Sequence, residues 1–459
     1  MNHTTRAGRI SKLRDRRCRV PGRDAARPLI LLLQGPVGPF FHILRDVLIR
    51  SGVDVLKVNF NGGDWLASHG PGTINFCGSV EEWSIWLETF VRRSRPASVV
   101  LFGDSRPYHR AAIAVGRETG IAVWCLEEGY ARPHFVTCEL YGNNALSPLC
   151  RPINPHDDTE QPLDPMQAVT GNLFRAMAVH AVGYFIAKSL GAPFFLGNIH
   201  HRSRGLLAET FLWSRSFYRK IVWYYANSSF IQGLLEHRDQ QYFIAALQVH
   251  DDQQLTRHGD GWTMERLITE TIQSFAAHAE AFHRLVFKVH PMDRGHKSYR
   301  RLVTEIAAIC GCADRVHVVD DGSIGLMIRH SIGVITVNST SGLLALNHGK
   351  PLLVLGRAVY LLEGLATPGG RDRRSIDRFW RGAQPPNADA VKLFMNRMYR
   401  ESQVNGSFYL RDFMRSTAER ILARIREAPA ENVVPLVPRP DESAAEQSQT
   451  IEHCNVRHT

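Results

Sequence analysis

The sequence contains no uncharged apolar run of about 18 residues, the length that a membrane-spanning helix needs. Its basic N-terminus is not followed by an apolar stretch and a small-residue cleavage site, so we expect no secretory signal peptide. Hydrophobic residues make up 44% and charged residues 22% of the 459 residues, which is ordinary for folded domains. The length suits two domains rather than one core.

Cysteine is scarce, with eight residues scattered along the chain. This spacing argues against a disulfide framework and for a reducing compartment. Cys310 and Cys312 form a C-x-C that no second pair completes, so the cysteines indicate no zinc knuckle. We interpret them as small buried hydrophobes.

Positive charge is in excess, with a formal net charge of +11. Residues 1–27 hold nine Lys or Arg against two Asp, which is typical of a disordered arm. A second basic patch combines "HHRSRG" at 200–205 with Arg215, Arg219 and Lys220. Such charge suits phosphate, a nucleotide, a nucleic acid or an acidic membrane, without choosing among them. No nucleic-acid-binding module is recognisable, so we expect no nucleic acid partner.

Apolar runs that end on glycine or polar residues alternate with amphipathic segments of helical spacing. The predicted strands of the first half are 29–35, 54–64, 98–107 and 121–129, with helices near 40–51, 80–93 and 107–119. The predicted strands of the second half are 241–248, 284–291, 315–321, 332–340 and 351–356, with helices near 262–283, 297–311 and 341–348. The pattern predicts an α/β protein with two Rossmann-type domains and parallel sheets.

The segment from about 160 to 235 has no strand signature and is predicted to be helical. We therefore expect a basic disordered arm at 1–27, a first domain at 28–150, a helical connection at 151–238, a second domain at 239–386, helices at 387–426 and a disordered tail at 427–459. The arm and the helix at 211–230 are candidates for membrane contact. Plain disorder of the arm and core packing of the helix are equally open.

Polar residues or glycines follow nearly every predicted strand. Ligands of open α/β sheets bind outside the carboxyl ends of the strands, so these positions are the strongest site candidates. They are Gln34, Gly35, Asp64, Gly103, Asp104, Ser105, Glu127, Glu128, Gly129, Gln248, His290, Pro291, Asp320, Asp321 and the run Asn338 to Gly342.

The stretch "VNSTSG" at 337–342 leads from a predicted strand into a helix. The hydroxyls of Ser339, Thr340 and Ser341, with free helix N–H groups, suit a phosphate, and Gly342 is expected to let a ligand approach closely. Plain N-capping by a serine is the alternative. The sequence lacks a GxxxxGK[ST] motif, which excludes a P-loop ATPase.

The stretch "FKVHPMD" at 287–293 ends another strand on Lys288, His290 and Pro291. The proline stops the strand and restrains the backbone beside the histidine. We interpret His290 either as a donor to phosphate or as an ordinary structural histidine, and the sequence alone favours neither.

The stretch "FGDSRPYH" at 102–109 contains the Gly-Asp-Ser of one esterase class. Asp104 and Ser105 lie deep in the predicted domain rather than at its first strand, which disfavours an esterase. We interpret these two residues, with Arg106 and His109, as polar contacts for an acceptor.

Two adjacent carboxylates, Glu127 and Glu128, end the fourth predicted strand. Neighbouring residues on a strand point to opposite faces, so we expect one to face the site and the other to support it. A carboxylate in a water-poor site serves as a general base or a nucleophile. A solvated pair in a loop is the alternative.

The stretch "LQVHDDQQL" at 247–255 adds Gln248, Asp252 and Gln254 after the first strand of the second domain. His250, Asp251 and Asp252 are conceivable metal ligands, but their spacing is not diagnostic and we expect no metal.

Together with "LLLQGPVGPFF", "EEGYARPHFVT" and "VITVNSTSGLLALNHGKPLLVLG", these stretches resemble the bacterial capsule polysaccharide biosynthesis and export family, in particular its KpsS-like β-Kdo glycosyltransferases. The resemblance covers about residues 28–360. It implies a GT-B-like fold and retaining transfer of Kdo from CMP-Kdo to a phosphatidylglycerol-type lipid, which starts the linker for capsular polysaccharide. Another nucleotide-sugar transferase of surface polysaccharide synthesis, or a non-catalytic capsule export component, is the alternative.

The resemblance also implies a cytoplasmic protein, peripheral at the inner face of the inner membrane, with no cofactor besides the CMP-Kdo donor. Its implied partners are a second Kdo transferase and the capsule export complex. It assigns the catalytic carboxylate to the Glu127–Glu128 motif, and we expect Glu128 in that role, Glu127 second and Asp104 assisting at the acceptor side.

The remaining expected contacts divide between donor and acceptor. The expected nucleotide contacts are Lys288, His290, Pro291, Asn338, Ser339, Thr340, Ser341 and Gly342. The expected acceptor contacts are Gln34, Gly35, Ser105, Arg106, His109, Arg132, Gln248, Asp252 and Gln254.

Overall fold

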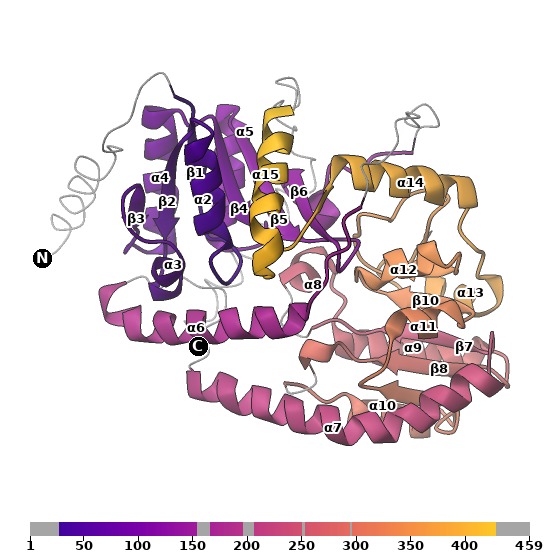
Figure 1. The fold of residues 1–459 in the computed structure, drawn as a ribbon. Helices are drawn as coiled ribbons and strands as arrows, with labels where there is room; N and C mark the ends of the chain where they lie inside the picture. The colour runs from indigo at the N-terminus through magenta and orange to yellow at the C-terminus, as the bar shows by residue number, and fades with distance from the viewer. Residues whose placement is uncertain (1–26, 154–165, 196–205, 250–252, 294–295, 428–459) are drawn as a thin grey trace, which may run out of the picture.

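The computed structural model describes residues 27–153, 166–195, 206–249, 253–293 and 296–427. Two sheets, each sandwiched between helices, are joined by the long helices α6 (Leu173–Gly191) and α7 (Leu206–His237) (Figure 1). The predicted α/β fold with two Rossmann-type units is confirmed. The exact domain boundaries stay predictions. Within the described residues, no helix combines the length and apolarity needed to cross a bilayer.

The first sheet has the order β13-β6-β5-β4-β1-β2-β3. Its strands are β1 (Leu29–Leu32), β2 (Asp54–Asn59), β3 (Thr73–Asn75), β4 (Ser98–Phe102), β5 (Ala122–Glu128), β6 (Phe135–Leu140) and β13 (Gln403–Asn405). One face packs against α2 (Phe40–Arg50) and α15 (Arg411–Glu427), and the other against α4 (Val80–Ser94) and α5 (Pro107–Thr119). Both faces of its central strands are therefore buried, which explains their continuous apolar runs.

The second sheet has the order β12-β11-β10-β7-β8-β9, and all its pairs are parallel. Its strands are β7 (Tyr242–Ala246), β8 (Arg284–Lys288), β9 (Val316–Val319), β10 (Gly333–Thr336), β11 (Leu352–Val354) and β12 (Thr367–Pro368). One face packs against α9 (Met264–His278), α10 (Arg300–Ile309) and α13 (Arg374–Gly382). The other packs against α11 (Ile324–Arg329), α12 (Ser341–Asn347) and α14 (Ala388–Glu401).

Two features of the first sheet differ from the sequence-based expectation. Strands β6 and β13 pair antiparallel at its edge, and β13 lies inside the segment 387–426 that was expected to be helical. The chain thus returns to the first sheet after completing the second. The ring of Phe408 then packs edge-on against Phe40 of α2, with ring centres 4.8 Å apart. Short strands paired over such sequence distances carry little local signal.

The strand orders place one switch point in each sheet. In the second sheet the order reverses between β7 and β10, as in a Rossmann fold, and in the first it reverses between β1 and β4. Ligands of such sheets bind at the carboxyl ends of these strands. The residues just after β1, β4, β7 and β10 are therefore the ones that the fold singles out.

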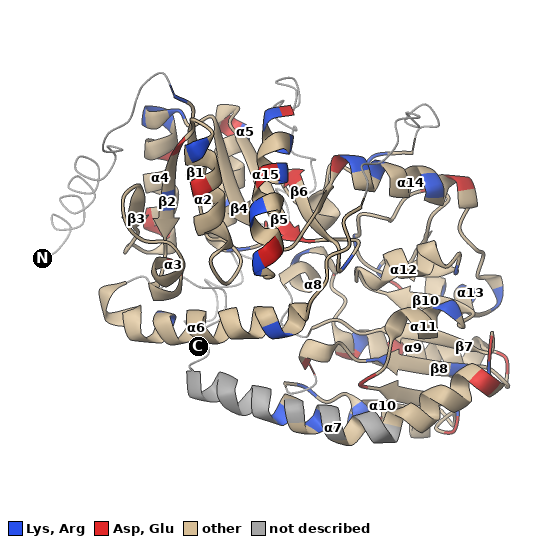
Figure 2. Ribbon diagram, viewed as in Figure 1, with Lys and Arg blue, Asp and Glu red and all other residues tan. Residues whose placement is uncertain are grey.

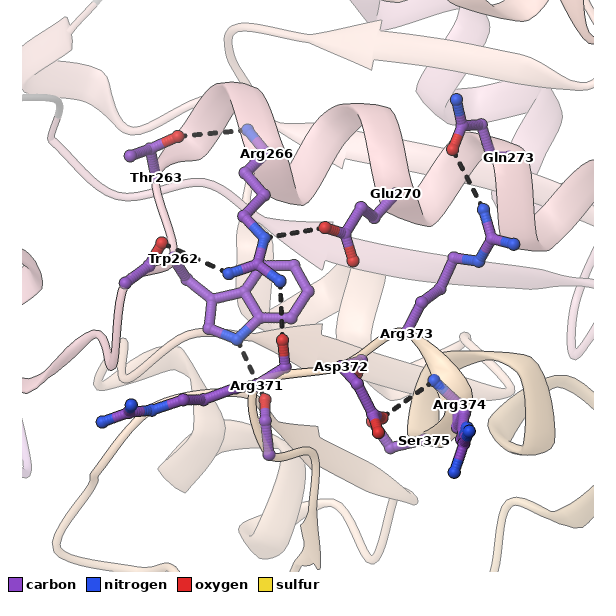
Figure 3. Close-up of polar contacts among 12 residues, drawn as sticks. Trp262, Thr263, Arg266, Glu270, Gln273, Arg371, Asp372, Arg373, Arg374 and Ser375 are labelled. Carbon is purple, nitrogen blue, oxygen red and sulfur yellow. Dashed lines mark hydrogen bonds and ion pairs between the residues drawn. The ribbon is translucent and has the colours of Figure 1, made fainter.

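The loop before α13 is tied to α9 on the outer side of the second sheet. Figure 3 shows Arg266 lying over the ring of Trp262 at 4.2 Å, with its guanidinium donating to Glu270 at 2.7 Å and to the carbonyl of Arg371 at 2.6 Å. The indole of Trp262 donates to the carbonyl of Gly370 at 3.0 Å. These contacts give Arg266 and Trp262 a structural role, because both side chains hold the backbone of this loop against α9.

Candidate active site

A buried polar network fills the switch point of the first sheet. The amide of Gln34, after β1, donates to both oxygens of Asp64 at 3.1 and 2.9 Å and to the hydroxyl of Tyr184 at 3.0 Å. Its carbonyl oxygen accepts from Arg106 at 2.5 Å and from the Tyr108 hydroxyl. Helix α6 therefore reaches this site through Tyr184, whose hydroxyl also donates to Asp64 at 2.9 Å.

The loop after β4 contacts the second domain through hydrogen bonds. Asp104 is fully buried, and its Oδ1 accepts from the Ser105 hydroxyl at 2.7 Å and from the Gln254 amide at 3.0 Å. Gln254 comes from α8 (Gln253–His258) of the second domain and also donates to Ser105 at 3.0 Å. Ser105 thus contacts a carboxylate and an amide rather than a histidine base, which speaks against an esterase nucleophile.

A second buried carboxylate supports Asp104 from behind. The other oxygen of Asp104 accepts from the Asn143 backbone at 2.9 Å, and the Asn143 side chain donates to Glu139 at 3.0 Å. Ser147 and Tyr130 donate to Glu139 at 2.6 and 3.1 Å. Sequence inspection did not single out this network, because Glu139 follows the alternation of an ordinary strand.

The two glutamates at the end of β5 face opposite sides of the sheet. Val123 and Cys125 belong to the core under α4 and α5, whereas Trp124 and Leu126 belong to the core under α2 and α15. The alternation directs Glu127 to the first side and Glu128 to the second.

Glu127 lies against the Asp104 loop. A Cβ built on Gly103 would stand 3.3 Å from a Glu127 carboxylate oxygen, and the other oxygen accepts from the Glu128 backbone at 3.2 Å. Burial raises the pKa of Glu127 to about 7, with the negative charges of Glu128 and Asp104 adding to the rise. A carboxyl group with that pKa exchanges protons readily at neutral pH.

Glu128 lies on the side of Tyr409. Burial and the hydrogen bond with Glu128 raise the pKa of the Tyr409 hydroxyl well above its usual value. The other carboxylate oxygen, Oε1 of Glu128, is buried and has no hydrogen-bond partner. A buried carboxylate oxygen without a protein donor is costly, so this atom is available to a hydrogen-bond donor or another ligand.

Two other expected acceptor residues are enclosed by the first domain. His109 is fully buried and its Nδ1 donates to the carbonyl of Gly103 at 2.7 Å, while its Nε2 has no partner. Burial and the nearby Arg106 hold the pKa of His109 well below its usual value, so the ring is neutral. At Gly35, a Cβ would stand 2.6 Å from the Phe41 ring, so this glycine makes room for Phe41. Both residues shape the loops around the site.

The switch point of the second sheet is held by an amide pair. Gln248, after β7, donates to Asn338, after β10, at 2.7 Å, and accepts from the Asn338 backbone at 3.1 Å. The Asn338 side chain donates to the carbonyl of Gln254 at 3.1 Å. The same Gln254 contacts Asp104, so an unbroken chain of hydrogen bonds links the two switch points.

The serine-rich loop at 339–342 is partly occupied by its own contacts. The Ser339 hydroxyl lies 3.0 Å from that of Ser341 and accepts from the Ser341 backbone at 3.2 Å. Thr340 is the N-cap of α12 and its side chain makes no capping bond. A Cβ on Gly342 would stand 2.3 Å from the Tyr360 ring, so the glycine makes room for Tyr360, and its contact with a ligand stays a prediction.

The stretch after β8 faces the loop that follows β5. His290 is half-buried, and its Nδ1 accepts from the Met292 backbone at 3.2 Å, within the turn that Pro291 begins. Burial, with the positive charges of Arg132 and Lys288, lowers the pKa of His290 to about 4. Arg132 belongs to the first domain and donates to the Gly129 carbonyl at 3.0 Å. The positive charges of two residues from different domains therefore both act on His290, which suits an anionic ligand.

His258 is a residue of this region that the sequence analysis missed. It lies four residues after Gln254 on α8, is 2% exposed, and has no hydrogen-bond partner at either ring nitrogen. Burial lowers its pKa to about 4, although the charge of Asp104 acts in the opposite direction. The spacing of four residues from Gln254 places both side chains on one helix face and was the available signal.

The conceivable metal ligands at 250–252 are not addressed by these contacts. Asp252, with His250 and Asp251, lies outside the described residues. Among the residues that the structure does describe, no group of three or more His, Cys, Asp or Glu side chains is placed to hold a metal ion. The absence of a metal from the reaction stays a prediction.

Two further cavities of about 300 and 380 Å³ lie along α7, and Asn227 lines both. Of the strand-end candidates named from the sequence, Asp321 lines the smaller cavity and none lines the larger.

The sequence comparisons with known proteins agree on one family. The profile of the capsule polysaccharide biosynthesis proteins matches residues 97–409. The chain is 32% identical to the capsule polysaccharide export protein KpsS of Escherichia coli, over 83% of this chain and 96% of that protein. It is 33% identical to the capsule polysaccharide modification protein LipB of Neisseria meningitidis, over 84% of this chain and 92% of that protein.

Solved structures with a similar arrangement are more distant. The β-Kdo 2,7 transferase of Thermosulfurimonas dismutans KpsC aligns with a TM-score of 0.42 at 13% identity, covering 86% of this chain and 99% of the other. The UDP complex of Staphylococcus aureus MnaA aligns with a TM-score of 0.31 at 12% identity, covering 90% and 99%. The profile match and the two sequence relatives span most of the chain, and the protein therefore belongs to the capsule polysaccharide biosynthesis family.

Proposed function

We propose that the protein is a retaining β-Kdo glycosyltransferase that moves Kdo from CMP-Kdo to a phosphatidylglycerol-type lipid, the first step of the linker for capsular polysaccharide. The family membership supports a role in capsule production. One observation carries the enzymatic proposal: Gln254 of the second domain bonds Asp104 and Ser105 of the first, beside a carboxyl group with a pKa near 7. The two strand-end sites thus face one another.

The donor is proposed to bind on the second-domain side. Lys288, His290 and the 338–341 loop follow the strands where a nucleotide binds in this fold class. Arg132 brings a further positive charge to His290. This arrangement would stabilise the phosphate of CMP as it leaves. His290 is proposed as a neutral hydrogen-bonding group rather than a charged one, because its pKa is about 4.

Retention follows from two successive displacements. In the first, Oε1 of Glu128 attacks the anomeric carbon of Kdo, and the bond from that carbon to the phosphate oxygen breaks, so that CMP leaves with the electron pair. In the second, a hydroxyl oxygen of the lipid attacks the same carbon and the bond to Glu128 breaks. Each step inverts the carbon, so the product keeps the donor's configuration.

Glu127 is proposed to accept the proton of the lipid hydroxyl in the second step. Two neighbouring carboxyl groups whose environments differ are a common way to obtain one nucleophile and one base. Burial raises the pKa of Glu127 to about 7, whereas Glu128 offers a buried oxygen without a protein donor. Asp104, held by Ser105, Gln254 and Asn143, is proposed to orient the acceptor side.

The proposed place of action is the inner face of the inner membrane, next to a second Kdo transferase and the capsule export complex. A lipid acceptor requires the enzyme to work at a bilayer surface. The names of the two relatives refer to export and modification of capsule polysaccharide, respectively, for those proteins.

A donor panel tests this function. The purified protein is incubated with phosphatidylglycerol-type lipid and either CMP-Kdo, another CMP-sugar or a UDP-sugar, and nucleotide release is measured. We expect CMP-Kdo to be turned over repeatedly only when lipid is present, and without lipid at most one CMP to be released per enzyme molecule. Equal or faster release from a UDP-sugar would instead support another nucleotide-sugar transferase, and no release from any donor would support a non-catalytic export component.

A further inference from the structure

Helix α6 is apolar around its whole circumference, yet one of its faces is exposed. Its 19 residues include only two charged side chains, Arg175 and Lys188. An all-round apolar helix is ordinarily buried on every side. Here the residues Val179, Val182, Ile186 and Leu190 are 64%, 59%, 41% and 73% exposed, and Phe194 beyond the helix is 77% exposed.

The exposed residues form one stripe. Positions 179, 182, 186 and 190 follow the three- and four-residue spacing of a single helix face. The adjoining helix α3 (Gly62–Ala67) adds Trp65 and Leu66, which are 46% and 49% exposed. An apolar surface of this extent is uncommon on a monomer and marks a site of contact with another phase or molecule.

The opposite face of α6 is fixed rigidly to the first domain. A Cβ on Gly62 would stand 2.2 Å from the Ala187 carbonyl oxygen, and one on Gly63 would stand 2.7 Å from the Tyr184 ring. The backbones of α3 and α6 are thus in close contact. Tyr184 also bonds Gln34 and Asp64 in the switch-point network. The stripe therefore cannot turn inward without breaking this packing.

The charge on α6 is positive. Of its two charged residues, Arg175 is exposed and Lys188 is buried. Figure 2 shows α6 without any acidic residue. An apolar stripe on a helix whose exposed charge is a cation matches a bilayer that contains anionic lipid, where apolar side chains enter the acyl boundary and cations meet the headgroups.

We propose that α6 is a monotopic docking surface that lies along an anionic bilayer, with the stripe at 179, 182, 186, 190 and 194 inserted at the level of the acyl boundary. The rigid packing on α3 then sets the distance of the polar site around Gln34 and Asp64 from the bilayer. The docking surface is inferred from exposure and charge, independently of the donor that the enzyme uses.

The test measures vesicle binding by co-sedimentation, with phosphatidylglycerol-containing or purely phosphatidylcholine vesicles. We expect the protein to bind the anionic vesicles, and Val182→Asp with Leu190→Asp to lower the partition coefficient at least about tenfold, because each change removes an inserted apolar group. The control is Ile309→Asp, at the 80% exposed last residue of α10, which should bind like the wild type. Thermal unfolding of each variant shows whether it is folded.

If the Val182→Asp/Leu190→Asp double variant does not fold, the milder double variant Val182→Ser/Leu190→Ser takes its place. We expect its partition coefficient to be lowered several-fold. Unchanged binding of the folded α6 variants would overturn the inference, as would wild-type protein that ignores anionic vesicles. If the α6 variants lose self-association in analytical ultracentrifugation but keep vesicle binding, the stripe is instead an interface with a second copy of the protein. Transfer to a lipid dispersed in detergent should be unaffected by the variants, which separates this inference from the proposed function.

Discussion

Replacing Glu128 by glutamine should abolish sugar transfer, with kcat/KM lowered on the order of 10⁴-fold or more, as for the loss of other covalent nucleophiles. The amide has the shape of the carboxylate but cannot form the bond to the anomeric carbon. Since Oε1 of Glu128 is buried without a protein donor, the substitution breaks no observed hydrogen bond of that atom. The variant should therefore fold normally and still bind the donor.

The matched control is Glu118→Gln, an exposed glutamate on α5 of the same domain, which should keep full activity. A direct check is to mix wild-type enzyme with CMP-Kdo in the absence of lipid, quench it, and locate the Kdo adduct by peptide mass spectrometry. We expect the adduct on Glu128. A Kdo adduct on Glu127 or Asp104, or a Glu128→Gln variant that still transfers sugar, would contradict the assignment.

Replacing Glu127 by glutamine should remove a pH dependence as well as most of the rate. The base must be ionised to accept the acceptor's proton, so wild-type activity should rise as the pH passes through about 7, the pKa of Glu127. Glutamine does not titrate. The variant should be slower by about 10²- to 10⁴-fold, and its residual rate should not rise over that interval. Measuring kcat/KM from pH 5.5 to 8.5 tests both effects.

The raised pKa of Glu127 also predicts that the folded protein becomes less stable as the pH rises, whereas its activity increases. The folded protein favours the protonated form of Glu127. The contribution of this group to the free energy of unfolding is therefore complete below its unfolded pKa near 4.5 and is lost as the pH rises through about 7. From pH 5 to 8 this group lowers the wild-type free energy of unfolding by about 2 to 3 kcal/mol. Glu127→Gln should lack this loss and Glu118→Gln should retain it. If urea unfolding shows the same pH dependence in Glu127→Gln, the raised pKa is refuted.

The general position of the site was predictable because a parallel sheet gathers the ends of its strands. Gln34, Asp104, Gln248 and Asn338 were all identified as strand-end residues, and the structure places them at the two switch points. The opposite orientations of Glu127 and Glu128 were likewise predictable, since they follow from the two-residue period of a strand.

Which glutamate meets which neighbours was not predictable, because those neighbours are distant in sequence. Tyr409 reaches Glu128 only because the chain returns to the first sheet after β13. The same applies to Gly342, whose partner Tyr360 lies beyond β11, and to His258, whose backbone carbonyl contacts Gly356 and Arg357 beyond β11. A pattern read along one segment contains no information about such partners.

Sequence reasoning named the helix at 211–230 as a candidate for membrane contact, and that candidate stays a prediction. The aromatic and basic composition of 211–230 pointed to α7, whereas the exposed apolar stripe lies on α6. Composition identifies a helix that is apolar on all sides, but only the packing of α3 on one side of α6 shows which side is left exposed.

Transfer of Kdo to lipid, followed by mass spectrometry, tests the central claim most directly. The purified protein is incubated with CMP-Kdo and a phosphatidylglycerol-type lipid, with no second Kdo transferase present, and the recovered lipid is compared with that from Glu128→Gln. We predict that the wild type alone adds a single Kdo residue to the lipid. Lipid of unchanged mass in the wild-type reaction, under conditions where the protein is folded and bound to vesicles, would contradict the account.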